Sequence, residues 1–514
     1  MNNNDIVNQL WKLCDVLRDD GVTYHQYVTE LTYLLFLKMA QETQAEAAIP
    51  EDCRWGQLVA RDGKKQLDFY RELLLKLGRE GKGRVQAIYA DSYTTLRRAK
   101  NLATIVTAID SIDWFNIDEE GIGDLYEGLL EKNAQEKKSG AGQYFTPRPL
   151  IDCMVALTQP RLGEVIQDPA AGTAGFLVTA HQWIMRALED EGRSIYSLSA
   201  EQAHFQLNQA LWGVELVQDT HRLALMNLML HGIEGGLAKE NIDTVAHDAD
   251  LPANSAPGQA DILDEQPRAY KGTLRLGDAL GSAGASLLPA DVILTNPPFG
   301  TKKGSGTPNR ADFTVTHDTS NKQLAFVEHI FRGLKPGGRA AVVLPDNVLF
   351  EDNTGKSLRT ALMERCNLHT ILRLPTGIFY AQGVKTNVLF FQRGHSEKGN
   401  TTETWVYDLR TNMPSFGKRN PFTLDHLKPF MDAYGADPNG KSPRTDQGEE
   451  GRFRRFTRAE IAERNDDLNI TWLRDDSIER AEDLPDPEEI ANEILNLLRT
   501  ATKEMEDLSD LLDG

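Results

Sequence analysis

The sequence is short of cysteine, of long apolar runs and of basic charge, and each shortage excludes a class of protein. We expect buried, reduced thiols rather than a disulfide framework or a metal site, because only four widely spaced cysteines occur in 514 residues: Cys14, Cys53, Cys153 and Cys366. No apolar run is long enough to cross a membrane and no signal peptide opens the chain, which predicts a cytoplasmic protein with no membrane partner. With 56 basic and 76 acidic residues, a net charge of −20, the chain is not a general polyanion binder.

The acidic excess is concentrated at the C-terminal end. From Ala481 onward eleven acidic residues stand against only Arg499 and Lys503, so nine of the twenty net negative charges lie in this segment. Its apolar residues recur at helical spacing, which predicts an amphipathic helix that phosphates would repel: Ile490, Ile494, Leu497, Leu498, Met505, Leu508 and Leu512. We expect its apolar face to pack against a partner's helices or against the rest of this chain.

The apolar patterning predicts three parts. Residues 1–135 form an N-terminal helical domain, because residues such as Leu10, Cys14 and Leu17 recur every three or four positions. Residues 136–434 form an α/β domain, because from Val165 onward strand and helix patterns alternate, which is typical of a mostly parallel, Rossmann-like sheet. Residues 435–514 follow as a linker and a helical tail, of which 435–452 are rich in glycine, proline and charge and are predicted to be flexible.

Polar side chains stand at the ends of the first four predicted strands. The strands are predicted at residues 165–167, 211–215, 273–278 and 291–296, and the side chains that end them are Asp168, Glu215, Asp278 and Asn296. Further strands are predicted at 338–345, 369–374, 387–392 and 405–410, and an inserted loop at 238–270. The carboxyl ends of parallel strands meet at one edge of an open sheet, where ligands bind. We therefore expect these four side chains to share a site.

The turn after the first strand has the composition of a ligand-binding loop. It is built of small residues that allow close approach of the backbone, and a helix N-terminus follows it: Ala170, Ala171, Gly172, Thr173, Ala174 and Gly175. It is neither G-x-G-x-x-G nor a P-loop, which disfavours a dinucleotide or a triphosphate. Glu215 suits ribose hydroxyls and Asp278 suits an adenine amino group. A nucleoside cofactor without pyrophosphate is predicted, and S-adenosyl-L-methionine is the common one.

The fourth strand leads into Asn296-Pro297-Pro298-Phe299. Two prolines cannot continue a sheet ladder, so they hold Asn296 in a rigid turn at the strand end. An amide oxygen, a proline carbonyl and an aromatic ring then lie side by side. This set suits an exocyclic amino group on a flat ring, with hydrogen bonds to Asn296 and Pro297 and stacking on Phe299.

Together these motifs resemble a known family. Asp168-Pro-Ala-Ala-Gly-Thr-Ala-Gly-Phe176 followed by Asn296-Pro-Pro-Phe299 resembles the DNA amino-methyltransferases. Gln143-Tyr-Phe-Thr-Pro147, ahead of both, is similar to the modification subunits of type I restriction–modification enzymes, in particular the group typified by the K-strain colibacterial enzyme. The segments Leu374-Pro-Thr-Gly-Ile-Phe379 and Asp408-Leu-Arg-Thr-Asn-Met-Pro414 look like the same family, in which Ala171 and Ala174 are commonly cysteine and glycine.

The resemblance implies an adenine-N6 DNA methyltransferase with an S-adenosylmethionine-dependent methyltransferase fold. It implies that a flipped adenine in double-stranded DNA binds at Asn296, Pro297, Pro298 and Phe299. The implied cofactor-binding residues are Gln143, Tyr144, Phe145, Thr146, Pro147, Arg148, Asp168, Gly172, Thr173, Ala174, Glu215 and Asp278. The implied partners are a DNA-specificity subunit, a second copy of this chain and a motor–nuclease subunit.

Three alternatives remain open at this point. An Asn-Pro-Pro-aromatic motif serves any planar amino group, so methylation of cytosine N4 or of a protein glutamine is compatible with it. A cofactor-binding subunit that mainly scaffolds a nuclease is also compatible. No metal site is predicted.

Overall fold

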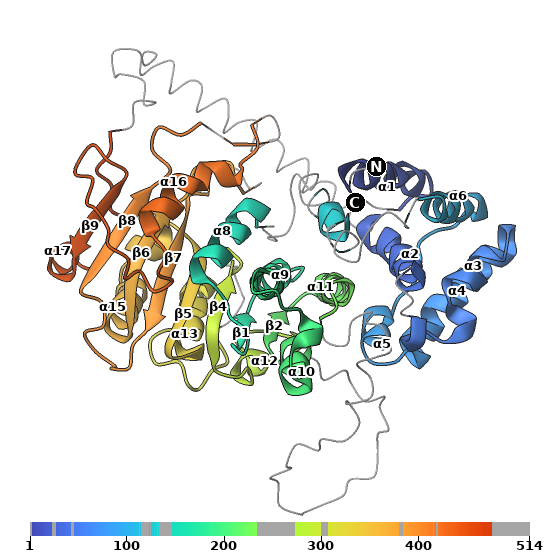
Figure 1. Ribbon diagram of the computed structural model, residues 1–514, viewed down its shortest axis with the longest axis horizontal. Helices are drawn as coiled ribbons and strands as arrows, with labels where there is room; N and C mark the ends of the chain where they lie inside the picture. The colour runs from blue at the N-terminus through green and yellow to red at the C-terminus, as the bar shows by residue number, and fades with distance from the viewer. Residues whose placement is uncertain are drawn as a thin grey trace, which may run out of the picture.

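The computed structural model contains an N-terminal group of helices and a nine-stranded sheet with helices on both faces (Figure 1). It describes residues 3–22, 27–42, 46–112, 114, 123, 125–130, 132, 146–233, 273–299, 307–379, 384–414, 416–417 and 420–474. No helix within these ranges is long and apolar enough to cross a membrane.

The described part of the N-terminal region is helical, as predicted. Its elements are α1 (Asn3–Asp19), α2 (Tyr27–Glu42), η2 (Glu46–Ala48), η3 (Glu51–Cys53), α3 (Trp55–Val59), α4 (Gly63–Glu80), α5 (Arg84–Tyr89) and α6 (Ala99–Asp110). Two buried carboxylates tie the start of α6 to the earlier helices. Asp20 accepts hydrogen bonds from the backbone N–H groups of Arg97 and Arg98, and Glu30 accepts them from Thr95. The Arg98 side chain itself is exposed.

The sheet has the strand order β3-β2-β1-β4-β5-β7-β6-β8-β9. The strands are β1 (Ile166–Asp168), β2 (Leu211–Glu215), β3 (Leu274–Leu276), β4 (Ala290–Thr295), β5 (Leu334–Pro345), β6 (Cys366–Arg373), β7 (Thr386–Arg393), β8 (Glu403–Asp408) and β9 (Phe453–Thr457). β1 to β5 are mutually parallel, whereas β7 lies antiparallel between β5 and β6. The predicted α/β methyltransferase architecture is therefore observed.

Two hydrophobic clusters sandwich the sheet, because side chains alternate along each strand. On β4, Val292 and Leu294 enter one cluster and Ile293 enters the other. The first cluster includes residues of α8 (Arg148–Thr158), α9 (Gly175–Asp190), α11 (Gln218–Leu230) and α16 (Leu424–Tyr434). The second includes residues of α13 (Lys322–Gly333), α15 (Thr354–Arg365) and α17 (Arg458–Glu463). The described residues also contain shorter helical segments: η5 (Ile195–Ser197), α10 (Ala200–Asn208), α12 (Ser282–Ala285) and α14 (Asn347–Phe350).

The N-terminal helices pack against α11 of the sheet-containing part. Arg84 of α5 donates a hydrogen bond to the carbonyl of Ile233 at 2.9 Å, and Arg222 of α11 donates one to the carbonyl of Ala90 at 2.7 Å. Figure 1 shows α9 and α11 between the sheet and the N-terminal helices. The first hydrophobic cluster continues across this contact without interruption.

The prediction of a flexible link at residues 435–452 is wrong. Arg444 donates a hydrogen bond to the Thr370 hydroxyl of β6 at 2.9 Å, and Gln447 pairs through its backbone with Phe453. Residues 453–457 then add β9 to β8, so the sheet continues beyond the predicted domain end at residue 434. The segment is polar because it lies on the surface, yet specific long-range hydrogen bonds fix it. The predicted insertion at 238–270 and the predicted tail helix lie outside the described residues.

Candidate functional site

The site lies where β1 and β4 run side by side. β1 pairs in parallel with β2 on one side and with β4 on the other, so the chain order reverses direction at this point. Such a switch point leaves a crevice at the carboxyl ends of the two strands. Asp168 ends β1 and Asn296 directly follows β4, so the fold brings together two residues that are 128 positions apart in the sequence.

The loop after β1 presents its backbone to this crevice. Gly172 has a φ of +53°, and a Cβ added there would meet no atom within 4 Å, so space lies directly in front of the loop. Ala174 is buried and adopts φ +66°, ψ 22°, a left-handed conformation that favours glycine. α9 begins at the next residue and points its N-terminus toward the loop. The geometry matches a loop that holds a ligand by backbone contacts.

Glu215 braces the loop from the end of β2. Its Oε2 accepts a hydrogen bond from the Gly172 N–H at 3.0 Å, and its Oε1 accepts one from the Val217 N–H at 2.8 Å. Burial raises the pKa of Glu215, and hydrogen bonds from the backbone of Val217, Gly172 and Leu216 act in the opposite direction. Each carboxylate oxygen has a second lone pair, which suits the two hydroxyls of a ribose.

Asp168 is the most buried acid of the crevice. It is 1% exposed, and its Oδ1 accepts a hydrogen bond from the Ala170 N–H at 3.0 Å. Burial raises the pKa of Asp168 to about 7, although the hydrogen bond from the Ala170 N–H lowers it. A carboxylate with this pKa gains free energy when a cation binds beside it.

Asp278 stands further out, in the turn after β3. It is exposed, and its carboxylate accepts the Leu280 N–H at 2.9 Å. Two exposed leucines lie close to this position: Leu216 follows β2 with 59% exposure, and Leu276 ends β3 with 49% exposure. Exposed leucines beside strand-end acids form an apolar surface for a flat ring. Sequence reasoning missed both leucines, although Leu216 directly follows Glu215 and Leu276 lies two residues before Asp278.

Asn296 is held by a residue from far upstream. Its Nδ2 donates a hydrogen bond to the Thr146 hydroxyl at 3.0 Å, which orients the amide. Pro297 is buried and Pro298 is exposed, so the two prolines lead the chain out of the sheet as predicted. The structure thus brings Thr146 and Asn296, both predicted site residues, into direct contact.

A second aromatic ring faces Phe299. Phe299 is half-buried, and its ring lies 6.1 Å from that of Phe379 at an interplanar angle of 74°. Phe379 is the last residue of the Leu374–Phe379 segment, which sequence reasoning used only for the family resemblance. Two rings in this edge-to-face arrangement form a corner against which a planar base can pack.

Only some of the remaining predicted cofactor-binding residues are described in the structure. Gln143, Tyr144 and Phe145 lie outside the described residues, whereas Pro147 is buried beside Thr146. The Arg148 guanidinium contacts the side chains of Asp152, Glu127 and Gln182. Arg148 is therefore bound to protein groups in this structure, and its predicted cofactor contact would be additional to these three.

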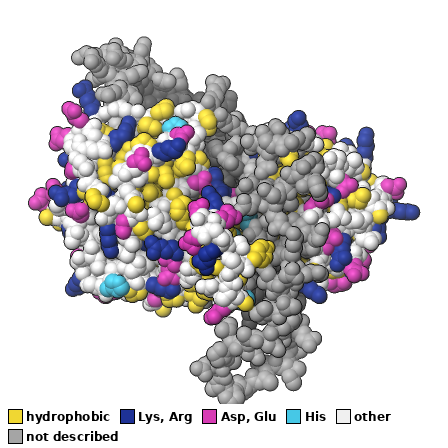
Figure 2. All heavy atoms as spheres, in the orientation of Figure 1, with side chains coloured by type: hydrophobic (Ala, Val, Ile, Leu, Met, Phe, Trp, Pro, Cys, Tyr) yellow, Lys and Arg dark blue, Asp and Glu magenta, His cyan; other side chains and the backbone are white. Residues whose placement is uncertain are grey.

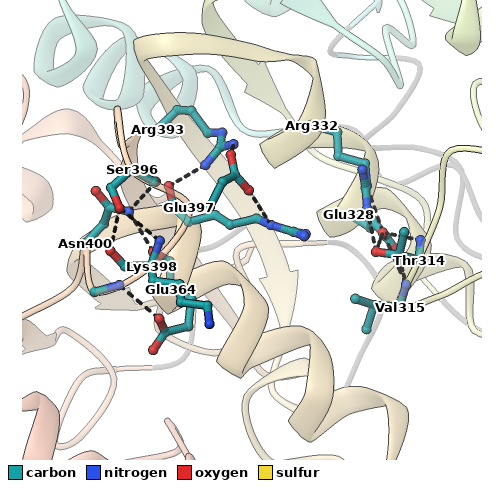
Figure 3. A network of polar contacts seen from close by, with 12 residues as sticks. Thr314, Val315, Glu328, Arg332, Glu364, Arg393, Ser396, Glu397, Lys398 and Asn400 are labelled. Atoms are coloured by element: carbon teal, nitrogen blue, oxygen red, sulfur yellow. Dashed lines mark hydrogen bonds and ion pairs between the residues drawn. The ribbon is translucent and has the colours of Figure 1, made fainter.

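A separate cavity of about 300 Å³ lies at the opposite edge of the sheet, beside the starts of β5 and β6. Its arginines are paired with acids of the same chain: Arg365 and Arg393 donate to Glu397, and Arg332 donates to Glu328 at 2.8 Å (Figure 3). Glu328 in turn accepts the backbone N–H groups of residues 314–316. These ion pairs and hydrogen bonds hold the segment before α13 against α13, and the turn after β7 against the ends of α15 and β7. They are remote from the strand ends that carry the site.

Neither a thiolate nor a metal cluster is found in the described part of the chain. All four cysteines are buried, and burial raises the pKa of Cys53 to about 11 and those of Cys14 and Cys366 to about 12. Among the described residues no three His, Cys, Asp or Glu side chains are arranged to hold a metal ion. Where Figure 2 shows described residues, basic and acidic side chains are interspersed on this face.

The comparisons with known proteins agree with these motifs. The family described as N-6 DNA Methylase matches residues 117–481, and the family described as HsdM N-terminal domain matches residues 6–109. The type I restriction enzyme EcoKI methylase subunit of Escherichia coli (strain K12) is 47% identical, covering 99% of this chain and 95% of that protein. The StySPI methylase subunit of Salmonella potsdam is 48% identical with the same coverage.

Two solved structures are similar over nearly the whole chain. The EcoKI M protein shares 43% identity with a TM-score of 0.55, covering 99% of this chain and 96% of the other. A chain from a study of complex assembly and conformational transition of the type I R-M system shares 26% identity with a TM-score of 0.67, covering 100% and 99%.

Proposed function

The chain belongs to the methylase subunits of type I restriction enzymes, which are N6-adenine DNA methyltransferases, and from this premise we propose how its residues carry out the reaction. The observation that carries the proposal is the adjacency of β1 and β4. It places the loop after Asp168 beside Asn296, so a methyl donor and a methyl acceptor would meet at one switch point.

The crevice fits S-adenosyl-L-methionine. Space lies in front of the Gly172 backbone, Glu215 faces the loop with acceptors for ribose hydroxyls, and Leu216 and Leu276 offer an apolar surface for the adenine ring. The buried Asp168 carboxylate suits the positive charge of the amino-acid part. When bound, this cofactor supplies an electrophilic methyl group on a sulfonium.

Asn296 and Pro297 would act on the acceptor. The lone pair of adenine N6 is conjugated into the ring, so the amino group is a poor nucleophile. Hydrogen bonds from N6 to the Asn296 amide oxygen and the Pro297 carbonyl favour a pyramidal nitrogen and aim its lone pair at the methyl group. The base must leave the duplex to reach this position, and Phe299, with Phe379 at its edge, would stack on it.

The family membership separates the activities that the sequence left open. The matched family is described as an N-6 DNA methylase, so adenine N6 is the target rather than cytosine N4 or a protein glutamine. The relatives are methylase subunits, which does not support a role confined to scaffolding.

We further propose that this subunit works in a complex. The partners are a specificity subunit that selects the DNA sequence, a second copy of this chain, and a motor–nuclease subunit that joins for cleavage. The name of one solved relative concerns assembly of the type I R-M system, which supports this proposal. Division into a helical domain over residues 1–135, a catalytic domain from residue 136 and a partner-binding tail remains part of the same proposal.

Replacement of Asn296 tests the proposed reaction. The Asn296→Ala complex, incubated with tritiated cofactor and target DNA, should lose methyl transfer by roughly a hundredfold or more, as for loss of a preorganised polar group. Cofactor binding measured by calorimetry should stay within a factor of about three, because the proposed cofactor contacts come from other residues. Near-normal methylation by this variant would contradict the assigned role.

A further inference from the structure

The helical turn at residues 125–130 places a carboxylate between α11 and the start of α8. Glu127 lies on this turn with its side chain 14% exposed. Its Oε1 accepts a hydrogen bond from the Asn227 amide at 3.4 Å, and its Oε2 accepts one from the Arg148 guanidinium. Glu127 therefore contacts both α11 and the start of α8.

Asn227 in turn contacts the loop after β1, and Arg148 lies close in sequence to the residue that contacts Asn296. Asn227, which is 1% exposed, also donates a hydrogen bond from the same Nδ2 to the carbonyl of Thr173 at 2.9 Å. Thr173 belongs to the loop after β1 and directly precedes the left-handed Ala174. On the other side, Arg148 begins α8 only two residues after Thr146, which holds Asn296.

The turn that carries Glu127 is itself attached to the N-terminal helices. Tyr126 donates a hydrogen bond to the Leu223 carbonyl of α11 at 3.3 Å, and Lys132 donates one to the Asn8 side chain of α1. A Cβ placed on Gly128 would approach Val7 of α1 at 3.0 Å, so the turn packs closely on that helix. A displacement of α1 would therefore move the Glu127 carboxylate.

We propose that Glu127 is a positioning residue. Through it, the N-terminal helical region sets the geometry of the loop after β1, which is the proposed cofactor loop, and of the segment around Thr146, which holds Asn296. The proposal rests on the cofactor site proposed above. Glu127 touches neither the cofactor nor the base. It fixes the Asn227 amide, which orients the Thr173 carbonyl, and it fixes the Arg148 guanidinium at the start of α8. Asn227 is 1% exposed, so water competes little for the hydrogen bonds that its amide donates to Glu127 and to Thr173.

Substitution of Glu127, made in the full complex, tests whether this residue positions the loop after β1 and the segment that holds Asn296. Glu127→Ala should raise the Kd for S-adenosyl-L-methionine by about 5- to 20-fold and lower kcat by a similar factor, as for loss of a hydrogen bond to a charged group. The KM for DNA should stay within about twofold, since no DNA contact is removed. Glu127→Gln keeps an acceptor for Asn227 and should recover most of the affinity.

Asp15→Ala is the matched control, because it removes an exposed ion pair with Arg18 on α1 and leaves the network intact. It should bind cofactor like the parent. If Glu127→Ala lowers only the melting temperature, with Kd and kcat unchanged, Glu127 is merely structural and the proposal is wrong. A parent complex that binds no S-adenosyl-L-methionine would instead overturn the proposed cofactor site itself.

Discussion

The Asn296 amide donates its hydrogen bond to the hydroxyl of Thr146, a residue that lies 150 positions earlier in the chain, at 3.0 Å. Since Nδ2 is the atom engaged, the bond orients the amide and thereby decides where its oxygen lies. Thr146 is 9% exposed, so water competes little for this contact. The residue just before α8 and the residue just after β4 are thus linked directly.

Loss of the Thr146 hydroxyl should impair catalysis more than binding. Thr146→Val keeps the shape of the side chain but cannot accept from Asn296, so kcat should fall by about tenfold, as for loss of one hydrogen bond of 1–1.5 kcal/mol. Thr146→Ser retains the hydroxyl and should restore most of the rate. Steady-state methylation assays distinguish them, and equal kcat values for the two variants would contradict the orienting role.

Phe379 should contribute to capture of the flipped base. Phe379→Ala removes the ring that meets Phe299 edge-to-face, at a cost of about 0.5–1.5 kcal/mol beyond lost burial. The fluorescence of 2-aminopurine at the target position should therefore change less on binding. Phe379→Leu controls for lost volume, since it fills the space without a ring. If Phe379→Ala captures the base as well as the parent does, the corner formed by the two rings is not part of the base site.

Glu215 should be required for cofactor affinity. Glu215→Ala removes acceptors for the ribose hydroxyls and also frees the Gly172 N–H, so binding should weaken by about 1.5–3 kcal/mol, or roughly 10- to 150-fold. Calorimetry with S-adenosyl-L-methionine measures this change. Glu189→Ala, which removes an exposed carboxylate near the end of α9, should leave the Kd unchanged. An unaltered Kd for Glu215→Ala would place the ribose elsewhere.

Asp168 should lower stability at high pH. Its pKa is raised to about 7, so between its ordinary pKa of 3.8 and pH 7 the folded chain holds a proton that the unfolded chain has lost. This group therefore reduces the free energy of unfolding as pH rises through that window, by about 1.4 kcal/mol per pKa unit. Asp168→Asn removes the effect and should raise the melting temperature more at pH 8.5 than at pH 5.5, while weakening cofactor binding. If the Asp168→Asn melting temperature rose equally at both pH values, burial would not be destabilising the charged form of Asp168.

The acidic tail should serve assembly rather than catalysis. Truncation after Asp483 should leave cofactor binding intact but impair association with the specificity subunit and hence sequence-specific methylation. Leu497→Ser combined with Leu508→Ser disrupts the predicted apolar face, whereas Glu504→Gln with Glu506→Gln alters only charge and is the control. Size-exclusion chromatography of the mixed subunits measures assembly. A truncated chain that still assembles and methylates at the parent rate would eliminate this role.

The sequence by itself determined the elements whose apolar pattern is local. β2 was predicted at residues 211–215 and is observed at Leu211–Glu215, and the predicted strand ends carry Asp168, Glu215 and Asn296 as expected. A short run of apolar residues ending in an acid, followed by small residues or prolines, is a signal within a few positions of the chain. That signal suffices for the fold class and for the residues at the strand ends.

Only the tertiary structure decided which distant residues complete the site. The apposition of Phe379 with Phe299, and the contacts of Glu127 with Asn227 and Arg148, join residues far apart in sequence. β9 escaped prediction for the same reason, since its polar residues form a strand by pairing with β8 at the edge of the sheet. The local periodicity of apolar residues indicates which side of a helix or strand faces the core. Long-range hydrogen bonds and ring contacts depend instead on how those helices and strands pack against one another, which local periodicity does not specify.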